Sequence, residues 1–416
     1  MGRGARHRAL TLTAAVVAAA ILAACQGRGE GQLGPGVNPG QQAGGPPAWV
    51  QVGTRVTWYT AGATVAQSRF AFVEDPTGEW VDKATGKHYR RTDESGEGQP
   101  GSGGDGFSQI DVIAREGTDI VGSNTLYVIN RVNGSLSPLP LAGARVDGEV
   151  VDGAWINPAR LATIEDQRMN GLLVVRGPYP VGGVTYQAIS FATTAAGNTQ
   201  QYTYDLATGV LLSATTYAQG ATSPVHAVGE APPQGNNLLT ITRIANIRAR
   251  PAPGLGGANP PWVAQTSQLR YVGTQSIFNP LDPSLGAVVL PMQVTINLGQ
   301  GGASWATFSE EIVIDAPLTQ PTSRSGVTGG AGLYWIDPTA FGNLSAGQAL
   351  DTDPVTGERV SVVGFDQGGA LVSFSSELPG TSVLTTYSTA TGALLAYRSE
   401  STASGQVIEL QLQNAP

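Results

Sequence analysis

The chain has 416 residues and a formal net charge of -8, because 31 acidic side chains outnumber 23 basic ones. This balance argues against a nucleic-acid partner, since phosphate would repel the chain and no concentrated basic patch is present in the sequence. The single cysteine, Cys25, leaves the rest of the chain without a thiol for a disulfide, a metal site or a nucleophile.

The first segment has the outline of a signal peptide. Arg3, Arg6 and Arg8 precede an uncharged, largely apolar run over residues 9–24, and we expect residues 1–24 to be removed on export. The run is shorter than the roughly 20 residues that a membrane-spanning helix needs. A permanent transmembrane segment is therefore the weaker interpretation.

The segment ends in Leu22-Ala23-Ala24-Cys25, which resembles the lipobox of bacterial lipoproteins. The resemblance covers only about the first 25 residues. It implies that Cys25 is acylated, becomes the new N-terminus and anchors the chain to a membrane of the cell envelope on the extracytoplasmic side. Gln26, where some bacteria with two membranes use aspartate for inner-membrane retention, favours the outer membrane or the cell surface. The alternative is an ordinary secreted protein that is cleaved near Ala24.

Two stretches rich in glycine and proline divide the rest of the chain. Such stretches bury little apolar surface and are typical of flexible tethers and linkers. We therefore predict five parts: a signal peptide (1–24), a lipidated cysteine with a flexible tether (25–47), a first β domain (48–249), a linker (250–261) and a second β domain (262–416).

Three landmarks recur in the same order in the two predicted domains and indicate an internal duplication. They are the segments at Trp49 and Trp262, at Trp155 and Trp335, and at residues 204–212 and 387–395. The first two landmarks lie farther apart in the first copy. This difference predicts a polar, glycine-rich insertion at about residues 75–107.

Within each copy, apolar and polar residues alternate, which favours antiparallel strands with one solvated face. Residues 205–209 and 353–357 pair an aspartate with a glycine and predict hairpin turns rather than a catalytic Asp-Thr-Gly. Asn157-Pro158 and Asp337-Pro338 combine an N-cap residue with a proline at the first helical position. They predict a helix of two or three turns in the first copy and about one turn in the second.

These patterns predict a mainly β chain of two related antiparallel β-sheet domains, each a curved sheet or half-barrel with one short helix. The alternation does not decide whether a sheet closes as a barrel, folds as a sandwich or stays open.

We find no motif of a known catalytic site or cofactor. His88 and His226 are the only histidines after the signal peptide, and no Gly-x-Ser-x-Gly or dinucleotide fingerprint accompanies them. Two histidines without a thiol give no zinc spacing. Glu310 and Glu311 are adjacent, so on a strand they point to opposite faces and make a poor carboxylate dyad. We expect no catalytic residue, metal or cofactor that the sequence would reveal.

The predicted insertion contains the densest cluster of charged residues. Because calcium prefers several carboxylate and carbonyl oxygens, one interpretation is a calcium site or a partner-binding loop. The other is a long surface loop that carries both signs of charge to stay solvated, and we favour it. The sequence does not decide whether the insertion binds calcium.

Trp155 and Trp335 are the weak candidates for a ligand-binding surface, since an aromatic ring on a sheet can stack on a sugar or line an apolar groove. A core anchor is the alternative that we favour for both.

The function class that we favour is a membrane-anchored lipoprotein with a non-catalytic binding or scaffold role. An apolar ligand or an envelope component would lie on a curved β-sheet, as in lipoprotein carriers with an open half-barrel. Lipid, glycan and protein all remain options for the partner. The competing class is a carboxylate-dependent hydrolase of envelope polymers. Carboxylates that face one another in a cleft would favour the hydrolase, and an apolar groove would favour binding.

Overall fold

The computed structural model describes most of the chain after the predicted tether, and all of it belongs to one compact unit, Ala43–Pro416. The described residues are 44–65, 72–74, 80–82, 88–91, 106–129, 134–151, 153–169, 172–195, 198–221, 225–227, 236–278, 286–316, 321–402, 405–414 and 416. The predicted signal peptide, Cys25 and residues 26–43 of the tether lie outside them. No helix in these ranges has the length and apolarity needed to cross a bilayer.

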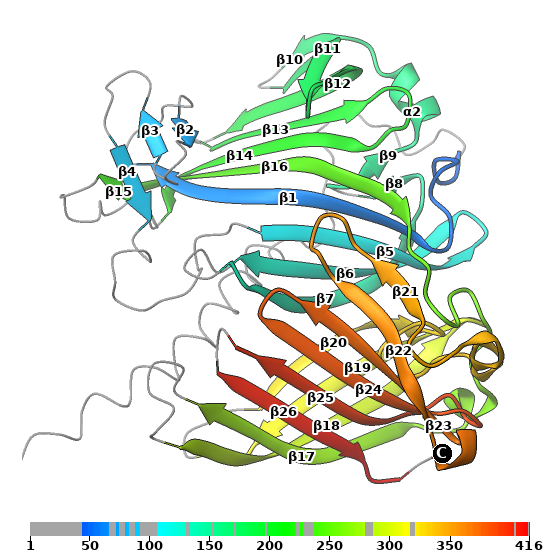
Figure 1. The fold of residues 1–416 in the computed structure, drawn as a ribbon. Helices are drawn as coiled ribbons and strands as arrows, with labels where there is room; N and C mark the ends of the chain where they lie inside the picture. Colours follow the sequence, from blue (N-terminus) through cyan, green and yellow to red (C-terminus); the bar gives the residue numbers. More distant parts are fainter. Residues whose placement is uncertain are drawn as a thin grey trace, which may run out of the picture. The chain divides into compact units, whose positions relative to one another are not determined.

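The first copy forms a ten-stranded antiparallel sheet whose first strand lies inside the sheet (Figure 1). The strands, in order across it, are β10 (Gln167–Met169), β11 (Leu172–Val181), β12 (Val184–Ala195), β13 (Asn198–Asp205), β14 (Leu211–Ala221), β16 (Asn236–Ala249), β1 (Thr54–Val65), β5 (Gly106–Glu116), β6 (Asp119–Ile129) and β7 (Leu136–Asp147).

The second copy repeats this order strand for strand. Its sheet runs β21 (Ala349–Thr352), β22 (Arg359–Asp366), β23 (Leu371–Leu378), β24 (Thr381–Ser388), β25 (Leu394–Ser401), β26 (Gln406–Leu412), β17 (Gln268–Phe278), β18 (Ala287–Gly301), β19 (Trp305–Ile314) and β20 (Thr322–Gly329). The predicted duplication and the mainly β fold are confirmed. Both sheets stay open, because the two edge strands of each do not pair with one another.

The copies differ most between their first two strands. The connection from β1 to β5 spans residues 66–105, whereas that from β17 to β18 spans only 279–286. The longer connection contains the predicted insertion and supplies three strands of a small sheet. Its order is β15 (Val225–Ala227), β4 (His88–Arg91), β3 (Trp80–Asp82) and β2 (Phe72–Glu74). The side chains of the charged insertion lie outside the described residues. The calcium hypothesis depends on these side chains and therefore stays a hypothesis.

Each copy has a short helix at the predicted cap, α2 (Pro158–Thr163) and η4 (Pro338–Asn343). The side chains of Asn157 and Asp337 each accept a hydrogen bond from the backbone amide two residues on. The length predicted for the first helix was wrong. The helix ends at Thr163, its C-cap Ile164 is extended, and β10 follows, because pairing with β11 outweighs the helical preference of this stretch. Two further 3-10 turns are η2 (Pro261–Ala264) and η5 (Gln367–Gly369).

The same tertiary hydrogen bond anchors the start of each copy. The Trp49 indole donates to the Thr208 carbonyl and the Trp262 indole to the Thr391 carbonyl, each at 2.7 Å. In each copy the acceptor precedes the glycine of a tight turn. The repeated landmarks of the sequence are therefore contacts that build each core.

Alternation along β1 separates two environments. Val56 and Trp58 are buried in the core of the first sheet with Trp155 and Leu161. Residues at odd positions, such as Arg55, point to the opposite face. That opposite face contributes to the site described next.

Candidate functional site

A cavity of about 370 Å³ lies between the two sheets. This volume is within the roughly 300–1,000 Å³ that is usual for small-molecule pockets. Strands β1 and β5–β7 of the first copy line one side, and strands of the second copy line the other. Most of its larger side chains are apolar or aromatic: Ile113, Pro138, Phe308, Val327, Leu350, Val360, Phe374, Leu378, Val383, Tyr387 and Tyr397.

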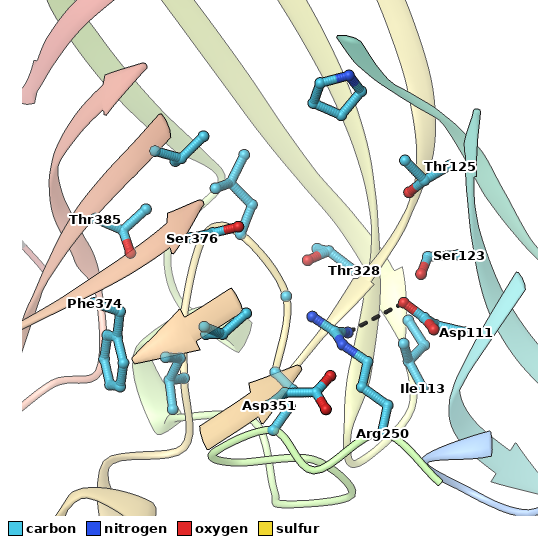
Figure 2. Close-up of a pocket in the computed structure, with 18 of the residues that line it drawn as sticks. Asp111, Ile113, Ser123, Thr125, Arg250, Thr328, Asp351, Phe374, Ser376 and Thr385 are labelled. Atoms are coloured by element: carbon cyan, nitrogen blue, oxygen red, sulfur yellow. Dashed lines mark hydrogen bonds and ion pairs between the residues drawn. The ribbon is translucent and has the colours of Figure 1, made fainter. Parts of the chain in front are cut away.

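The second sheet supplies the wall through alternate residues of its strands. Val383, Thr385 and Tyr387 on β24 line the cavity, whereas Leu384 between them is exposed on the other face. Figure 2 shows Thr385 beside Phe374, its direct cross-strand partner on β23. The wall is therefore built on sheet positions whose direction the strand period fixes.

The first sheet closes the cavity with the face opposite its own core. Ile113, Ala114 and Val121 of the first copy pack against Trp305 and Val327 of the second in a small buried cluster. A hydrogen bond from the Leu136 amide to the Pro379 carbonyl, 2.7 Å long, also joins the copies. The first repeat thus covers the core-facing side of the second sheet.

A buried ion pair stands at the rim of the cavity. Arg55 is 3% exposed and holds Asp111 with two hydrogen bonds, Nε to Oδ1 at 2.7 Å and Nη2 to Oδ2 at 2.9 Å. Arg250 adds a third bond to Asp111 Oδ2 at 3.2 Å. Figure 2 shows the Arg250 guanidinium reaching Asp111 across this end of the cavity. The bidentate geometry suits a guanidinium and a carboxylate that are both removed from water.

Asp353 extends this pair into a network that links the two copies. It lies in the turn between β21 and β22 and is 1% exposed. Its Oδ2 accepts hydrogen bonds from Arg55, Gln109 and Arg248, each at 3.0 Å, all from the first sheet. Its Oδ1 accepts from the amide of Val355 at 2.9 Å and of Thr356 at 3.0 Å, as the predicted turn requires. One side chain therefore shapes the turn and fastens the sheets.

Arg248 and Asp351 complete the network. Arg248 donates to the two carboxylate oxygens of Asp351 at 2.7 Å each, from β16 to β21. Glu358 is less tightly bound. Its Oε2 lies 3.4 Å from Arg55 Nη1, and its Oε1 accepts from the Ser376 hydroxyl at 2.7 Å.

The pKa values of two network carboxyls are lowered. Burial alone would raise the pKa of Asp111, but the neighbouring guanidinium groups of Arg250 and Arg55 outweigh it. Burial acts on Asp353 in the same direction, and the backbone amides of Thr356 and Val355, with the arginines, bring its pKa below the ordinary aspartate value. Both carboxylates stay ionised at neutral pH.

A second ion pair, between the buried Glu310 and the half-buried Arg324, lies within the second sheet. Arg324 donates from Nε to Glu310 Oε1 at 2.8 Å and from Nη2 to Oε2 at 2.9 Å. The hydroxyl of Tyr334 also donates to Glu310. Glu310 is 5% exposed and Glu311 is exposed, so the two glutamates do point to opposite faces and form no dyad.

The aromatic candidates from the sequence do not line the cavity. Trp155 and Trp335 are both fully buried, and each packs edge-on against the first tryptophan of its copy, Trp49 or Trp262. Both occupy the core-anchor position that we favoured. His88 and His226 lie on β4 and β15 of the small sheet.

Sequence reasoning missed Arg55, Asp111, Asp353 and Glu358 as site residues. Arg55 and Asp111 alternate with core positions, which equally predicts a solvated face, and Asp353 was predicted only as the first residue of a turn. Among the described residues, no group of three or more histidine, cysteine, aspartate or glutamate side chains is placed to hold a metal ion.

Neither comparison with known proteins identifies a relative: no family model matches the chain, and no curated protein matches its sequence. The function must therefore be argued from the cavity itself.

Proposed function

We propose that this chain is a lipid-anchored protein of the cell envelope that binds an apolar or amphiphilic small molecule in the cavity between its two sheets. The observation that carries the proposal is a cavity of about 370 Å³ with mainly apolar and aromatic walls and charged groups at one end. Such a lining gains from removing apolar ligand surface from water, and the polar end fixes the ligand's orientation.

The anchor belongs to the same proposal. Acylated Cys25 would hold the folded unit at the outer membrane or the cell surface, on the extracytoplasmic side, where an envelope lipid is at hand. A Cys25→Ser variant should leave the membrane fraction, and its mass should lack the fatty-acyl addition of the wild-type chain. A variant that stays in the membrane would remove the anchor from the proposal.

To identify the ligand, protein made without residues 1–25 is incubated with a bacterial envelope extract and then purified again without detergent. Native mass spectrometry should find a small apolar molecule bound to the chain. A protein partner in its place would favour a scaffold, and a glycan would favour recognition of an envelope polymer.

The site is tested by filling it. Thr385→Trp places an indole in the cavity wall and should abolish binding of a fluorescent fatty-acyl probe. Leu384→Trp adds the same group to the exposed face of the same strand and should leave binding unchanged. Equal binding by the two variants, with both folded as judged by thermal unfolding, would refute the cavity as the site.

The alternative is the hydrolase of envelope polymers, which the convergence of Asp111, Asp351 and Glu358 at the cavity favours. Two observations argue against the hydrolase. Each of these carboxylates contacts a guanidinium. A general acid also needs a raised pKa, whereas that of Asp111 is lowered. Hydrolysis of envelope glycans that Asp111→Asn abolishes would favour the enzyme.

A further inference from the structure

The charged rim holds one more carboxylate than it has guanidinium groups. The carboxylates are Asp111, Asp351, Asp353 and Glu358, and the guanidinium groups are Arg55, Arg248 and Arg250. Arg324 also lines the cavity, but Glu310 balances its charge. Because charges interact more strongly away from water, an excess of one negative charge here favours a positive ligand group and opposes a negative one.

The excess falls on Glu358. Asp111, Asp351 and Asp353 each accept at least one guanidinium hydrogen bond of 3.0 Å or less. The guanidinium contact of Glu358 is longer, 3.4 Å to Arg55 Nη1, the same nitrogen that bonds Asp353 at 3.0 Å. Its other side-chain bond is a neutral one from the Ser376 hydroxyl at 2.7 Å. Its side chain is 14% exposed and lines the cavity.

A second polar group of the cavity is the Tyr127 hydroxyl. Tyr127 is 5% exposed and lines the cavity, where the charge of Glu358 acts on it. Burial, and then the charge of Glu358, raise the pKa of Tyr127, so the phenol keeps its proton.

A ligand that donates hydrogen bonds suits both groups. The Glu358 carboxylate can only accept, and the Tyr127 hydroxyl can accept as well as donate. An ammonium group brings three donors and the missing positive charge. A carboxylate head could accept hydrogen bonds from Arg250 or Arg324, which also line the cavity, but it would add a second uncompensated negative charge.

From this arrangement we infer that the ligand is an amphiphile with a positively charged, hydrogen-bond-donating head, an alkyl ammonium in chemical class, and that Glu358 is its counter-charge. The inference rests on the proposed function, because it assumes that the cavity holds the apolar part of the ligand.

The test uses residues 26–416, which contain the compact unit, at pH 7 with three ten-carbon probes: decylamine, decanol and decanoate. Each probe displaces a fluorescent acyl reporter. Decylamine should bind at least about tenfold more tightly than decanoate, a difference of about 1.4 kcal/mol, with decanol between them. Decanoate binding as tightly as decylamine would overturn the inference while leaving the proposed function intact. A wild-type chain that binds none of the three probes would overturn both.

Two variants assign the preference to its residues. Glu358→Gln should bring decylamine and decanoate to about the same affinity, whereas Glu377→Gln, an exposed change on β23, should keep the wild-type ratio. Tyr127→Phe keeps the ring and removes the hydroxyl, and it should weaken decylamine and decanol alike by severalfold. A wild-type ratio in folded Glu358→Gln protein overturns the role of Glu358. If that variant does not fold, unchanged binding by Tyr127→Phe overturns the placement of the head group.

Discussion

The two sheets carry different cross-strand pairs at the same position. In the first sheet the pair is Arg55 with Asp111, and both are buried. In the second it is Gln268 with Asn297, where an exposed amide donates to an exposed carbonyl oxygen at 2.9 Å. The face of the first sheet that carries the charges is covered by the other repeat, and the matching face of the second is open.

A matching hydrogen bond establishes that the positions correspond. The Trp58 indole donates to the Leu211 carbonyl at 3.0 Å, and the Tyr271 hydroxyl donates to the Leu394 carbonyl at 3.1 Å. Counting back three residues from each aromatic gives Arg55 and Gln268. The comparison shows that the inner contacts of the duplicated sheets are kept, while their outer faces have diverged with their surroundings.

The largest effect on stability should follow from removing the Asp353 carboxylate, which joins the charged face of the first sheet to the second sheet. Asp353→Ala removes the buried acceptor of three side-chain donors from the first sheet and of two turn amides. It should lower the free energy of unfolding by about 3–5 kcal/mol, although Arg55 keeps Asp111 and Arg248 keeps Asp351. Chemical denaturation measures it. The control is Asp366→Ala on β22, which is exposed and should change stability by less than about 0.5 kcal/mol. Equal effects would mean that the network does not hold the two sheets together.

Replacing the glycine of the repeated turn by alanine should lower stability by nearly the same amount in both copies. Gly209 and Gly392 have φ of 76° and 72°, and an added Cβ would lie 1.8 Å from the Ile156 carbonyl oxygen and 2.0 Å from that of Ile336. Each Gly→Ala change should cost about 3 kcal/mol of stability. Gly342→Ala, which meets no atom within 4 Å, is the control. A large loss in one copy alone would contradict the structural equivalence of the turns.

Acid should weaken the covered face selectively, with a smaller effect than Asp353→Ala. Because the pKa values of Asp111 and Asp353 are lower in the folded state, their contribution is present above the ordinary aspartate value of about 3.9 and is lost as the pH falls below it. The free energy of unfolding, measured from pH 7 to pH 2, should fall mainly below pH 4. Asp353→Asn should flatten that slope, and a slope unchanged by it would refute this cause.

The smallest expected effect is a difference in stability loss between variants of the repeated tryptophans, Trp155 and Trp335. The Trp155 indole donates to the Gly148 carbonyl at 3.0 Å, whereas the Trp335 indole nitrogen is buried with no partner among the described residues. Trp155→Phe should therefore cost about 1 kcal/mol more than Trp335→Phe. Thermal unfolding of the two variants gives the comparison, and a larger loss for Trp335→Phe would reverse it.

The fold was accessible from the sequence because its signals are local. Alternation predicted the strands, Asn157 and Asp337 predicted the helix starts, and the recurring landmarks predicted the duplication. The first helix was predicted too long because β10 forms only by pairing with β11. The cavity could not be predicted, since it depends on which outer face the other repeat covers. Arg55 has the sequence pattern of a solvated residue, and only the tertiary structure shows that it is buried.

The most direct test of the ligand cavity is a crystal structure of residues 26–416 grown with decylamine that carries a bromine on its last carbon. Anomalous scattering locates the bromine without reference to a model. The account predicts one bromine peak within the cavity, near apolar wall residues such as Phe374, with the ammonium group beside Glu358. Bromine bound only on the outer faces of the sheets, or a cavity that holds ordered water alone, would contradict it.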